Sequence, residues 1–241
     1  MMRRLIAPIV LALAACSHAP AQAPVASPTR SSTAALPAAS PAASVDLERF
    51  ASEIAAFDAA DRANPPASGG IVFVGSSTIR MWTSLADDFA GLPVINRGFG
   101  GSTFPEALHY LQRTVVRYHP RTVVVYEGDN DLASGRTPRQ VADDYRVFVR
   151  GVRDSLPDAR IVFLDIKPSP SRWGLESQRQ EANRLVRAIV ASDPNQTFVD
   201  VGTPMLDASG RPRPALFRAD SLHMTPAGYA IWRATVAPIL K

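Results

Sequence analysis

Hydrophobic residues in most of the chain fall into five short runs, with longer amphipathic segments between them. The runs are rich in β-branched residues and almost continuous, which is typical of strands buried on both faces of a sheet. They predict strands at 71–75, 92–96, 122–128, 160–165 and 197–201. The intervening pattern predicts helices near 46–61, 77–90, 104–118, 138–154, 174–192 and 225–239.

The alternation of strand and helix predicts an α/β fold. We expect a flavodoxin-like three-layer sandwich, in which a parallel five-stranded sheet carries helices on both faces. Ligands of such sheets bind beyond the carboxyl ends of the strands. The residues expected just after the strands are rich in Gly, Ser, Asn and Asp, among them Gly75-Ser76-Ser77, Asn96-Arg97-Gly98, Gly128-Asp129-Asn130 and Gly202-Thr203. The functional site is therefore expected at this edge.

The N-terminal segment lacks this alternation. Residues 2–4 are Met-Arg-Arg and residues 5–15 are apolar, a stretch shorter than the about 20 residues that cross a bilayer as a helix. Residues 1–15 are thus predicted to be a secretory signal peptide. The sequence Leu-Ala-Ala-Cys at 13–16 resembles the lipobox of bacterial lipoproteins, which implies lipidation of Cys16. The alternative is a plain signal peptide followed by an incidental cysteine.

Residues 16–44 consist almost entirely of Ala, Pro and Ser. Such a segment cannot bury enough apolar surface to offset its chain entropy, so we predict a disordered tether. Residues 45–241 then form one domain. We expect an exported lipoprotein on the periplasmic side of a bacterial membrane, held there by a lipid on Cys16, or otherwise a periplasmic or secreted protein.

Charge and cysteine content exclude several classes of function. The formal net charge is +4, and it falls to +2 if Arg3 and Arg4 leave with the signal. Because the basic residues are scattered, with no dense basic stripe and no interleaved aromatics, nucleic-acid binding is not expected. Cys16 is the only cysteine, so the domain has no disulfide. We also expect a monomer.

One histidine lies beside an acid at a spacing suited to catalysis. Asp220 precedes His223 by three residues, and three residues along a turn bring two side chains to one side. The carboxylate can then hold one ring nitrogen and leave the other free as a base. A serine added to such a pair gives the nucleophile, base and orienting acid of acyl transfer. The same spacing also occurs in surface pairs that have no catalytic role.

Three hydroxyl side chains follow the first predicted strand, at Ser76, Ser77 and Thr78. A serine at such a junction exposes its hydroxyl at the sheet edge, with its N–H directed toward developing negative charge. By local rules, each of the three hydroxyls could equally be a helix N-cap.

Four separated blocks of the chain resemble the SGNH hydrolase superfamily, also called GDSL-type esterases and lipases. They are VGSST (74–78), NRGFGG (96–101), GDND (128–131) and DSLH (220–223), and the resemblance extends over about 45–241. It implies that Ser77 is the nucleophile, His223 the base and Asp220 the orienting acid, and that Ser77, Gly101 and Asn130 form the oxyanion hole. Ser76 stands where the family usually has an aspartate.

Structural roles are the alternatives for two of these residues. Gly101 could serve only a tight turn, and Asn130 could form a turn with Asp129 and Asp131. From the resemblance we expect a serine ester hydrolase that works through an acyl-enzyme and needs no metal and no organic cofactor. The alternatives are an acyltransferase or lysophospholipase-like activity on an envelope lipid or glycan, and a non-catalytic envelope binding protein.

Other classes of site do not fit the sequence. An α/β-hydrolase needs a Gly-x-Ser-x-Gly elbow, and the chain contains none. The segment that begins at Asp129 departs from a calcium-binding loop at Ala133. The glycines at 98–101 lack the lysine of a P-loop.

The substrate is expected to be a small-molecule ester. The sequence IKPSPSRWG, 166–174, follows the fourth strand, and we hypothesise that Lys167, Arg172 and Trp173 line the pocket and favour an anionic or sugar-like ester. The alternative is a surface loop fixed by its prolines. The chain has no long apolar lid segment, which favours small acyl groups.

Overall fold

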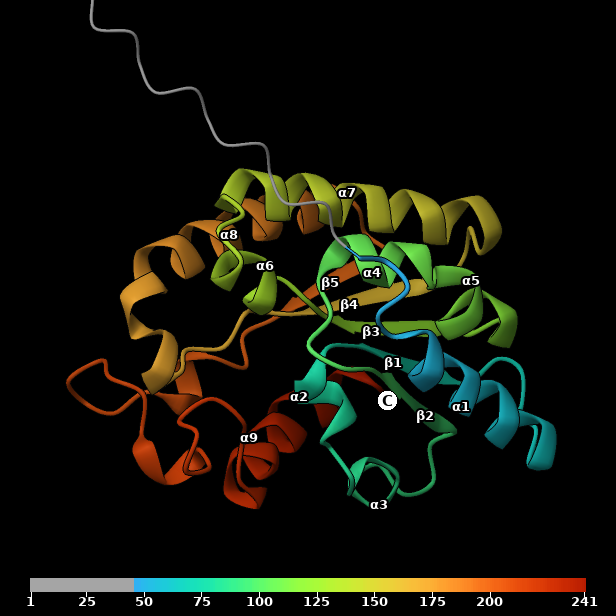
Figure 1. Cartoon of the computed structure of the whole chain (residues 1–241), viewed down its shortest axis with the longest axis horizontal. Coiled ribbons are helices and arrows are strands. Elements are labelled where there is room, and N and C mark those ends of the chain that lie inside the picture. The colour runs from blue at the N-terminus through green and yellow to red at the C-terminus, as the bar shows by residue number, and fades with distance from the viewer. Residues whose placement is uncertain (1–45) are drawn as a thin grey trace, which may run out of the picture. The chain divides into compact units, whose positions relative to one another are not determined.

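The protein was analysed as a computed structural model that describes residues 46–241. The predicted signal peptide, Cys16 and the predicted tether lie outside the described residues. The described chain holds a five-stranded parallel sheet with strand order β2-β1-β3-β4-β5. The strands are β1 (Ile71–Gly75), β2 (Val94–Gly98), β3 (Thr122–Tyr126), β4 (Arg160–Leu164) and β5 (Gln196–Val199) (Figure 1).

Nine α-helices among the described residues connect and flank the strands. They are α1 (Ala51–Ala63), α2 (Ser77–Arg80), α3 (Leu85–Asp88), α4 (Phe104–His109), α5 (Leu111–Thr114), α6 (Asp129–Ala133), α7 (Pro138–Ser155), α8 (Glu176–Val190) and α9 (Pro226–Val236). Short 3-10 helices are η1 (Val116–Tyr118), η2 (Pro170–Leu175), η3 (Thr203–Met205), η4 (Pro214–Leu216) and η5 (Ala237–Ile239). None of the helices within 46–241 is both long and apolar enough to span a bilayer.

Alternate residues of the central strands point into two separate hydrophobic cores. Val72 and Val74 of β1 pack in one core with residues of α4, α5, α7 and α8. Ile71 and Phe73 face the other core, which includes residues of α2, α3 and α9. Figure 1 shows α7 and α8 on one side of the sheet and α3 and α9 on the other. The predicted three-layer α/β sandwich is thereby confirmed.

The predicted boundaries of the second strand were wrong by two residues. The strand begins at Val94 and runs to Gly98, so Asn96 and Arg97 lie within it instead of after it. β2 is an edge strand, and tertiary contacts satisfy its polar side chains. Arg97 is buried and forms an ion pair with Asp61, which offsets part of the cost of burying its charge.

The predicted helix at 77–90 is also divided, into α2 and α3. The side-chain amide of Asn96 donates to the carbonyls of Ile79 (2.6 Å) and Trp82 (3.4 Å). These contacts satisfy carbonyl groups at the point where α2 stops. The predicted helix at 104–118 likewise consists of α4, α5 and η1, and the short helix α6 was not predicted.

Candidate active site

Ser77 lies where β1 ends and α2 begins. Ser76 occupies the N-cap position of α2 with an extended backbone, and its side chain makes no capping hydrogen bond. Gly75 has φ 151°, and a Cβ atom there would lie 2.2 Å from the carbonyl oxygen of Tyr126. Glycine is therefore required for the sharp turn that presents Ser77. Ser76 is buried and Ser77 is partly exposed.

The structure brings Ser77, His223 and Asp220 together. Ser77 Oγ lies 2.9 Å from His223 Nε2, and His223 Nδ1 lies 2.7 Å from Asp220 Oδ2. Since a carboxylate only accepts, Nδ1 is assigned as the protonated nitrogen, and Nε2 is free to accept the hydroxyl proton. This is the arrangement of a serine nucleophile, a base and an orienting acid.

A tight loop fixes the position of Asp220. Its Oδ1 accepts the backbone N–H groups of Leu222 and His223, each at 2.9 Å. Hydrogen bonds from the His223 ring and from these N–H groups hold the pKa of Asp220 well below its usual range. Asp220 is therefore a carboxylate at every pH where an esterase is assayed, although 47% of its side chain is exposed.

Three hydrogen-bond donors suited to an oxyanion lie just beyond the ends of β1, β2 and β3, at the start of α2, in the loop after β2 and in α6. The backbone N–H groups of Ser77 and Gly101 have no hydrogen-bond partner within residues 46–241. Asn130 Nδ2 donates one hydrogen to the carbonyl of Ser102 at 2.9 Å and keeps a second one free. A Cβ atom on Gly101 would lie 3.7 Å from Asn130 Nδ2, so these two residues adjoin.

The loops that carry these groups are hydrogen-bonded to each other. The N–H of Ser76 donates to the carbonyl of Tyr126 at 3.3 Å, and the N–H of Phe99 donates to that of Gly75 at 2.9 Å. Together with the contact between Asn130 and Ser102, these bonds fix the three loops at one edge of the sheet, where the fold predicts a site.

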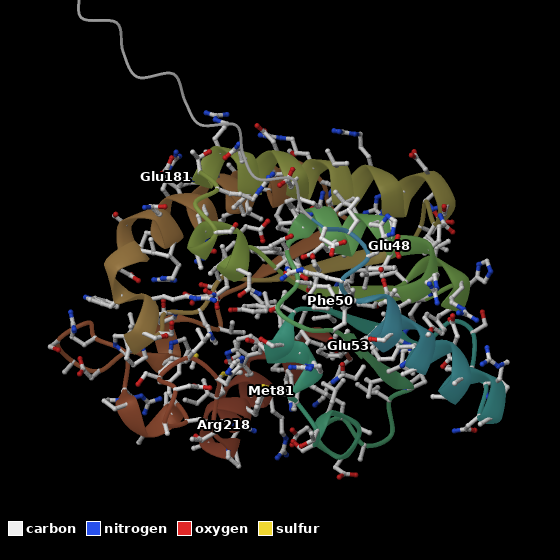
Figure 2. The ribbon with its side chains drawn as sticks, in the orientation of Figure 1. Glu48, Phe50, Glu53, Met81, Glu181 and Arg218 are labelled. Carbon is white, nitrogen blue, oxygen red and sulfur yellow. The ribbon has the colours of Figure 1, made fainter. Side chains whose placement is uncertain are left out.

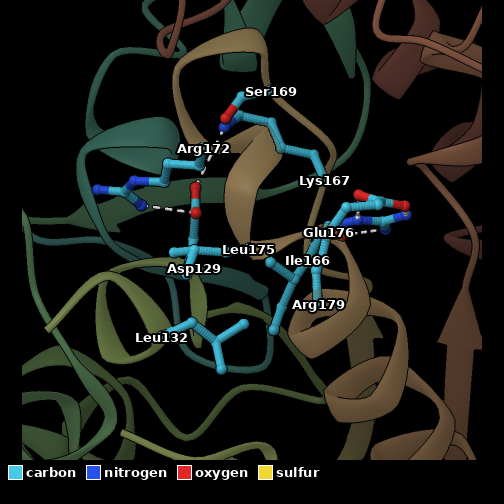
Figure 3. A pocket seen from close by; sticks show the side chains of 9 residues that line it. All are labelled: Asp129, Leu132, Ile166, Lys167, Ser169, Arg172, Leu175, Glu176 and Arg179. Atoms are coloured by element: carbon cyan, nitrogen blue, oxygen red, sulfur yellow. Dashed lines mark hydrogen bonds and ion pairs between the residues drawn. The ribbon is translucent and has the colours of Figure 1, made fainter. Parts of the chain in front are cut away.

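The three residues expected to line a substrate pocket lie in different environments. Lys167 is only 1% exposed, and its Nζ lies 3.2 Å from Asp129 Oδ2. Lys167 thus borders a small internal cavity instead of an open pocket (Figure 3). Arg172 points toward α6 and contacts both Asp129 and Asn130. Trp173 is partly exposed, and the guanidinium of Arg211 lies over its ring at 4.5 Å from the centroid.

The cavity is lined by charged side chains whose charges are largely paired. Burial raises the pKa of Asp129, but Lys167 and Arg172 outweigh this effect and hold it below its usual range. Burial lowers the pKa of Lys167, and Asp129 opposes that effect. Arg179 pairs with Glu176 at 2.6 Å.

Residues 98–101, which contain three glycines, are called the glycine loop. Sequence reasoning missed three fully buried carboxyl groups behind this loop. Glu106 accepts from both the N–H and the hydroxyl of Thr103, at 2.9 Å each. Glu127 accepts the hydroxyl of Ser102 at 2.5 Å, and Asp131 accepts the N–H of Phe104 at 3.1 Å. The Thr-x-x-Glu pattern of a capping box was available as a signal for Glu106. No comparable pattern identifies the other two.

Burial has a large effect on two of these groups. It raises the pKa of Glu127 well above its usual value, and nearby Asp131 adds to the shift. Burial also raises the pKa of Asp131 to about 7. Burial therefore favours the protonated, neutral form of Glu127.

The start of α1 and the two residues before it support the glycine loop from the other side. Arg49 pairs with Glu106 and donates to the carbonyl of Gly101 at 3.2 Å. Glu53 accepts the N–H of Gly100 at 3.0 Å. A Cβ on Gly100 would lie 1.8 Å from the ring of Phe50. Figure 2 labels Phe50 and Glu53 on this part of the chain.

Comparison with known proteins identifies the family. Residues 69–231 match the GDSL-like Lipase/Acylhydrolase family. Subunit alpha1 of platelet-activating factor acetylhydrolase IB from Pongo abelii is 30% identical over 181 residues, which are 71% of this chain and 75% of that protein. The Homo sapiens protein of the same name is 28% identical with the same coverage. The chain belongs to the GDSL-like lipase/acylhydrolase family and is an ester-bond hydrolase.

Solved structures share the fold. A GDSL-like lipase from Bacteroides thetaiotaomicron superposes with a TM-score of 0.66 at 19% identity, over 78% of this chain and 96% of that one. A variant of the acetylxylan esterase Axe2 from Geobacillus stearothermophilus gives a TM-score of 0.59 at 16% identity, over 72% of this chain and 95% of that one. Within residues 46–241, no group of three or more His, Cys, Asp or Glu side chains is arranged to hold a metal ion.

Proposed function

We propose that the protein hydrolyses carboxylic esters with a small acyl group, through an acyl-enzyme on Ser77. The observation that carries this proposal is the hydrogen-bonded series from Ser77 Oγ through His223 to Asp220. The N–H groups of Ser77 and Gly101 and the amide of Asn130 adjoin it as donors.

Acylation begins when Ser77 Oγ attacks the ester carbonyl carbon and its proton passes to His223 Nε2. The new Oγ–C bond places negative charge on the former carbonyl oxygen, where the three donors stabilise it. The bond to the leaving alcohol then breaks, and His223 gives that oxygen the proton. Asp220 stabilises the imidazolium while the proton is held.

Deacylation repeats the same steps with water. His223 takes a proton from a water molecule, whose oxygen attacks the acyl carbon, and the proton then passes to Ser77 Oγ as the bond to the serine breaks. The carboxylic acid leaves, and the free enzyme is restored.

Two kinds of support favour a small acyl group. The related protein from Pongo abelii is named an acetylhydrolase, and Axe2, which shares the fold, is named an acetylxylan esterase. An acetyl group is the acyl group common to both names. A long acyl chain needs an extended apolar surface to bury it at about 0.8 kcal/mol per CH₂, and the sequence contains no long apolar lid segment.

A panel of p-nitrophenyl esters of increasing acyl length tests this proposal. The purified full chain is expected to cleave the acetate with the highest kcat/KM, and the value should fall steadily beyond the butyrate. A Ser77→Ala variant, assayed in parallel, controls for contaminating esterases. A maximum at long chains would contradict the small-acyl assignment, and the absence of hydrolysis in the wild type would contradict the function.

We further propose that the protein is exported and attached to a membrane through Cys16. The charged start, the short apolar stretch and the Leu-Ala-Ala-Cys sequence support this. A Cys16→Ser variant should move from the membrane fraction to the soluble fraction of cells without losing activity on a soluble ester. An unchanged distribution would contradict the anchor.

A further inference from the structure

The side-chain amide of Asn130 has two chemically different ends. Its Nδ2 carries two hydrogens and can stabilise an oxyanion, whereas its Oδ1 would repel one. An oxyanion hole built on asparagine therefore needs a contact that fixes which end faces the reacting atoms. Nδ2 bonds to the carbonyl of Ser102 at 2.9 Å, and Oδ1 has a different partner.

That partner is Arg172. Its Nη2 donates to Asn130 Oδ1 at 2.8 Å. A flipped amide would place its NH₂ group against the guanidinium, where donor faces donor, and would turn Oδ1 toward the carbonyl of Ser102. Both contacts would then become unfavourable, so Arg172 and Ser102 together select one orientation of the amide.

From this contact we propose that Arg172 is a positioning residue of the oxyanion hole, which keeps the amide N–H of Asn130 directed at the developing negative charge. The inference rests on the proposed function, because it assigns Arg172 a task within that mechanism. It replaces the hypothesis that the Arg172 guanidinium binds a substrate anion.

The guanidinium is itself held in place. Arg172 Nη1 lies 2.6 Å from Asp129 Oδ1, and Lys167 Nζ lies 3.2 Å from Asp129 Oδ2. Figure 3 shows Arg172 and Lys167 approaching the Asp129 carboxylate from different directions. Asp129 directly precedes Asn130 in α6. One nitrogen of the guanidinium therefore pairs with Asp129, and the other holds the amide of the next residue, Asn130.

This pairing argues against direct recognition of an anionic substrate. The charge of Arg172 is compensated by Asp129: its Nη1 is buried in ion-pair contact with that carboxylate without a well-directed hydrogen bond, and its Nη2 donates to Asn130. The side chain is only 20% exposed.

The segment that carries Arg172 also touches the other half of the site. The N–H of Ser171 donates to the carbonyl of Ser221 at 3.1 Å, and Ser221 lies between Asp220 and His223 in the sequence. Residues 171 and 172 therefore link the loop of the base to the asparagine of the oxyanion hole. A change at Arg172 is expected to alter the position of Asn130 more than the binding of substrate.

An Arg172→Lys variant tests the inference directly. Lysine keeps a positive charge beside Asp129, which protects the fold, but its single nitrogen cannot replace a fork that contacts two residues. We expect kcat for p-nitrophenyl acetate to fall about 10-fold to 100-fold. This loss is smaller than the loss from removing an oxyanion donor altogether, because the Asn130 amide is still present but no longer held in one orientation. KM should stay within about twofold. Arg184→Lys, which makes the same substitution at an exposed arginine of α8, is the matched control and should retain wild-type kcat.

A double-mutant cycle separates positioning from other roles. If Arg172 acts through Asn130, adding Arg172→Lys to Asn130→Ala should change kcat by less than about twofold. Independent, additive losses would overturn the inference. A rise in KM confined to an ester that carries a carboxylate, with kcat unchanged, would also overturn the inference. It would support the earlier hypothesis that Arg172 binds a substrate anion.

A measurement without substrate distinguishes failure of this inference from failure of the proposed function. The side-chain amide signal of Asn130 can be assigned in an NMR spectrum by its absence in Asn130→Ala. It should shift and broaden in Arg172→Lys and stay unchanged in Arg184→Lys. An unperturbed signal in Arg172→Lys would reject the positioning role, whatever esters the enzyme cleaves.

Discussion

Ser76 and Ser77 are adjacent serines in different surroundings. The side chain of Ser77 meets His223, whereas Ser76 is 2% exposed and lies at the N-cap of α2 without a capping bond. Removal of the hydroxyl at Ser77 is therefore expected to lower kcat by about three orders of magnitude or more. Ser76→Ala should lower it less than about 10-fold, as measured with p-nitrophenyl acetate. The reverse order of effects would contradict the assignment of the nucleophile.

In the proposed mechanism, Asn130 contributes one of three oxyanion donors. Loss of a single oxyanion donor typically costs about 10²-fold to 10³-fold in kcat, so Asn130→Ala should fall in that range with little change in KM. Steady-state kinetics on the same ester provide the measurement. A variant with near-normal kcat would remove Asn130 from the oxyanion hole.

The sequence could nominate these residues but could not by itself assign their roles. From spacing alone, Asp220 and His223 could be either a catalytic pair or a surface pair. Each of the three hydroxyls at 76–78 could be either the nucleophile or a helix N-cap. The family resemblance selected among them, and the structure then placed Ser77, His223 and Asp220 in contact. The bond between Arg172 and Asn130 joins residues 42 positions apart, and no local pattern encodes such a contact.

At the level of elements, α2 lies directly on β2. A Cβ atom on Gly98 would lie 2.2 Å from the backbone nitrogen of Arg80. Gly98→Ala should therefore push α2 away, lower the free energy of unfolding by about 1–3 kcal/mol and reduce kcat because α2 carries Ser77. Gly174→Ala is the control, since a Cβ there meets no atom within 4 Å. Equal unfolding midpoints in urea for the two variants would contradict this account of the packing.

Element boundaries were predictable where burial alone decides them. β1 is buried along its whole length, and its apolar run predicted both of its ends. β3 is also buried and begins at the predicted residue, but it ends at Tyr126, two residues before its predicted end. β2 was misplaced because its polar residues Asn96 and Arg97 depend on partners in α2 and α1, which lie elsewhere in the chain. The short helix α6 escaped prediction because its sequence, Asp-Asn-Asp-Leu-Ala, is also that of a turn.

For the whole molecule, the buried Glu127 makes stability depend on pH. Its pKa in the folded state lies well above the unfolded value of 4.5, so between these two values the folded protein binds more protons than the unfolded chain. The free energy of unfolding must then fall as pH rises through this window, by at most about 1.4 kcal/mol per pH unit for one such group.

Glu127→Gln removes this contribution while keeping an oxygen that can accept from Ser102. Urea unfolding between pH 5 and pH 8 should show a smaller loss of stability with rising pH in this variant than in the wild type. The exposed Glu181→Gln is the control and should follow the wild-type slope. Identical slopes in all three proteins would show that Glu127 is ionised in the folded state.

The central claim is that an acyl group passes through Ser77, and trapping that intermediate tests it most directly. The full chain is mixed with p-nitrophenyl acetate, quenched in acid within the first turnover and analysed by intact-protein and peptide mass spectrometry. We predict one added acetyl group, located on the peptide that contains Ser77 and absent from Ser77→Ala. An acetyl group on another residue, or rapid turnover by Ser77→Ala without any adduct, would contradict the mechanism.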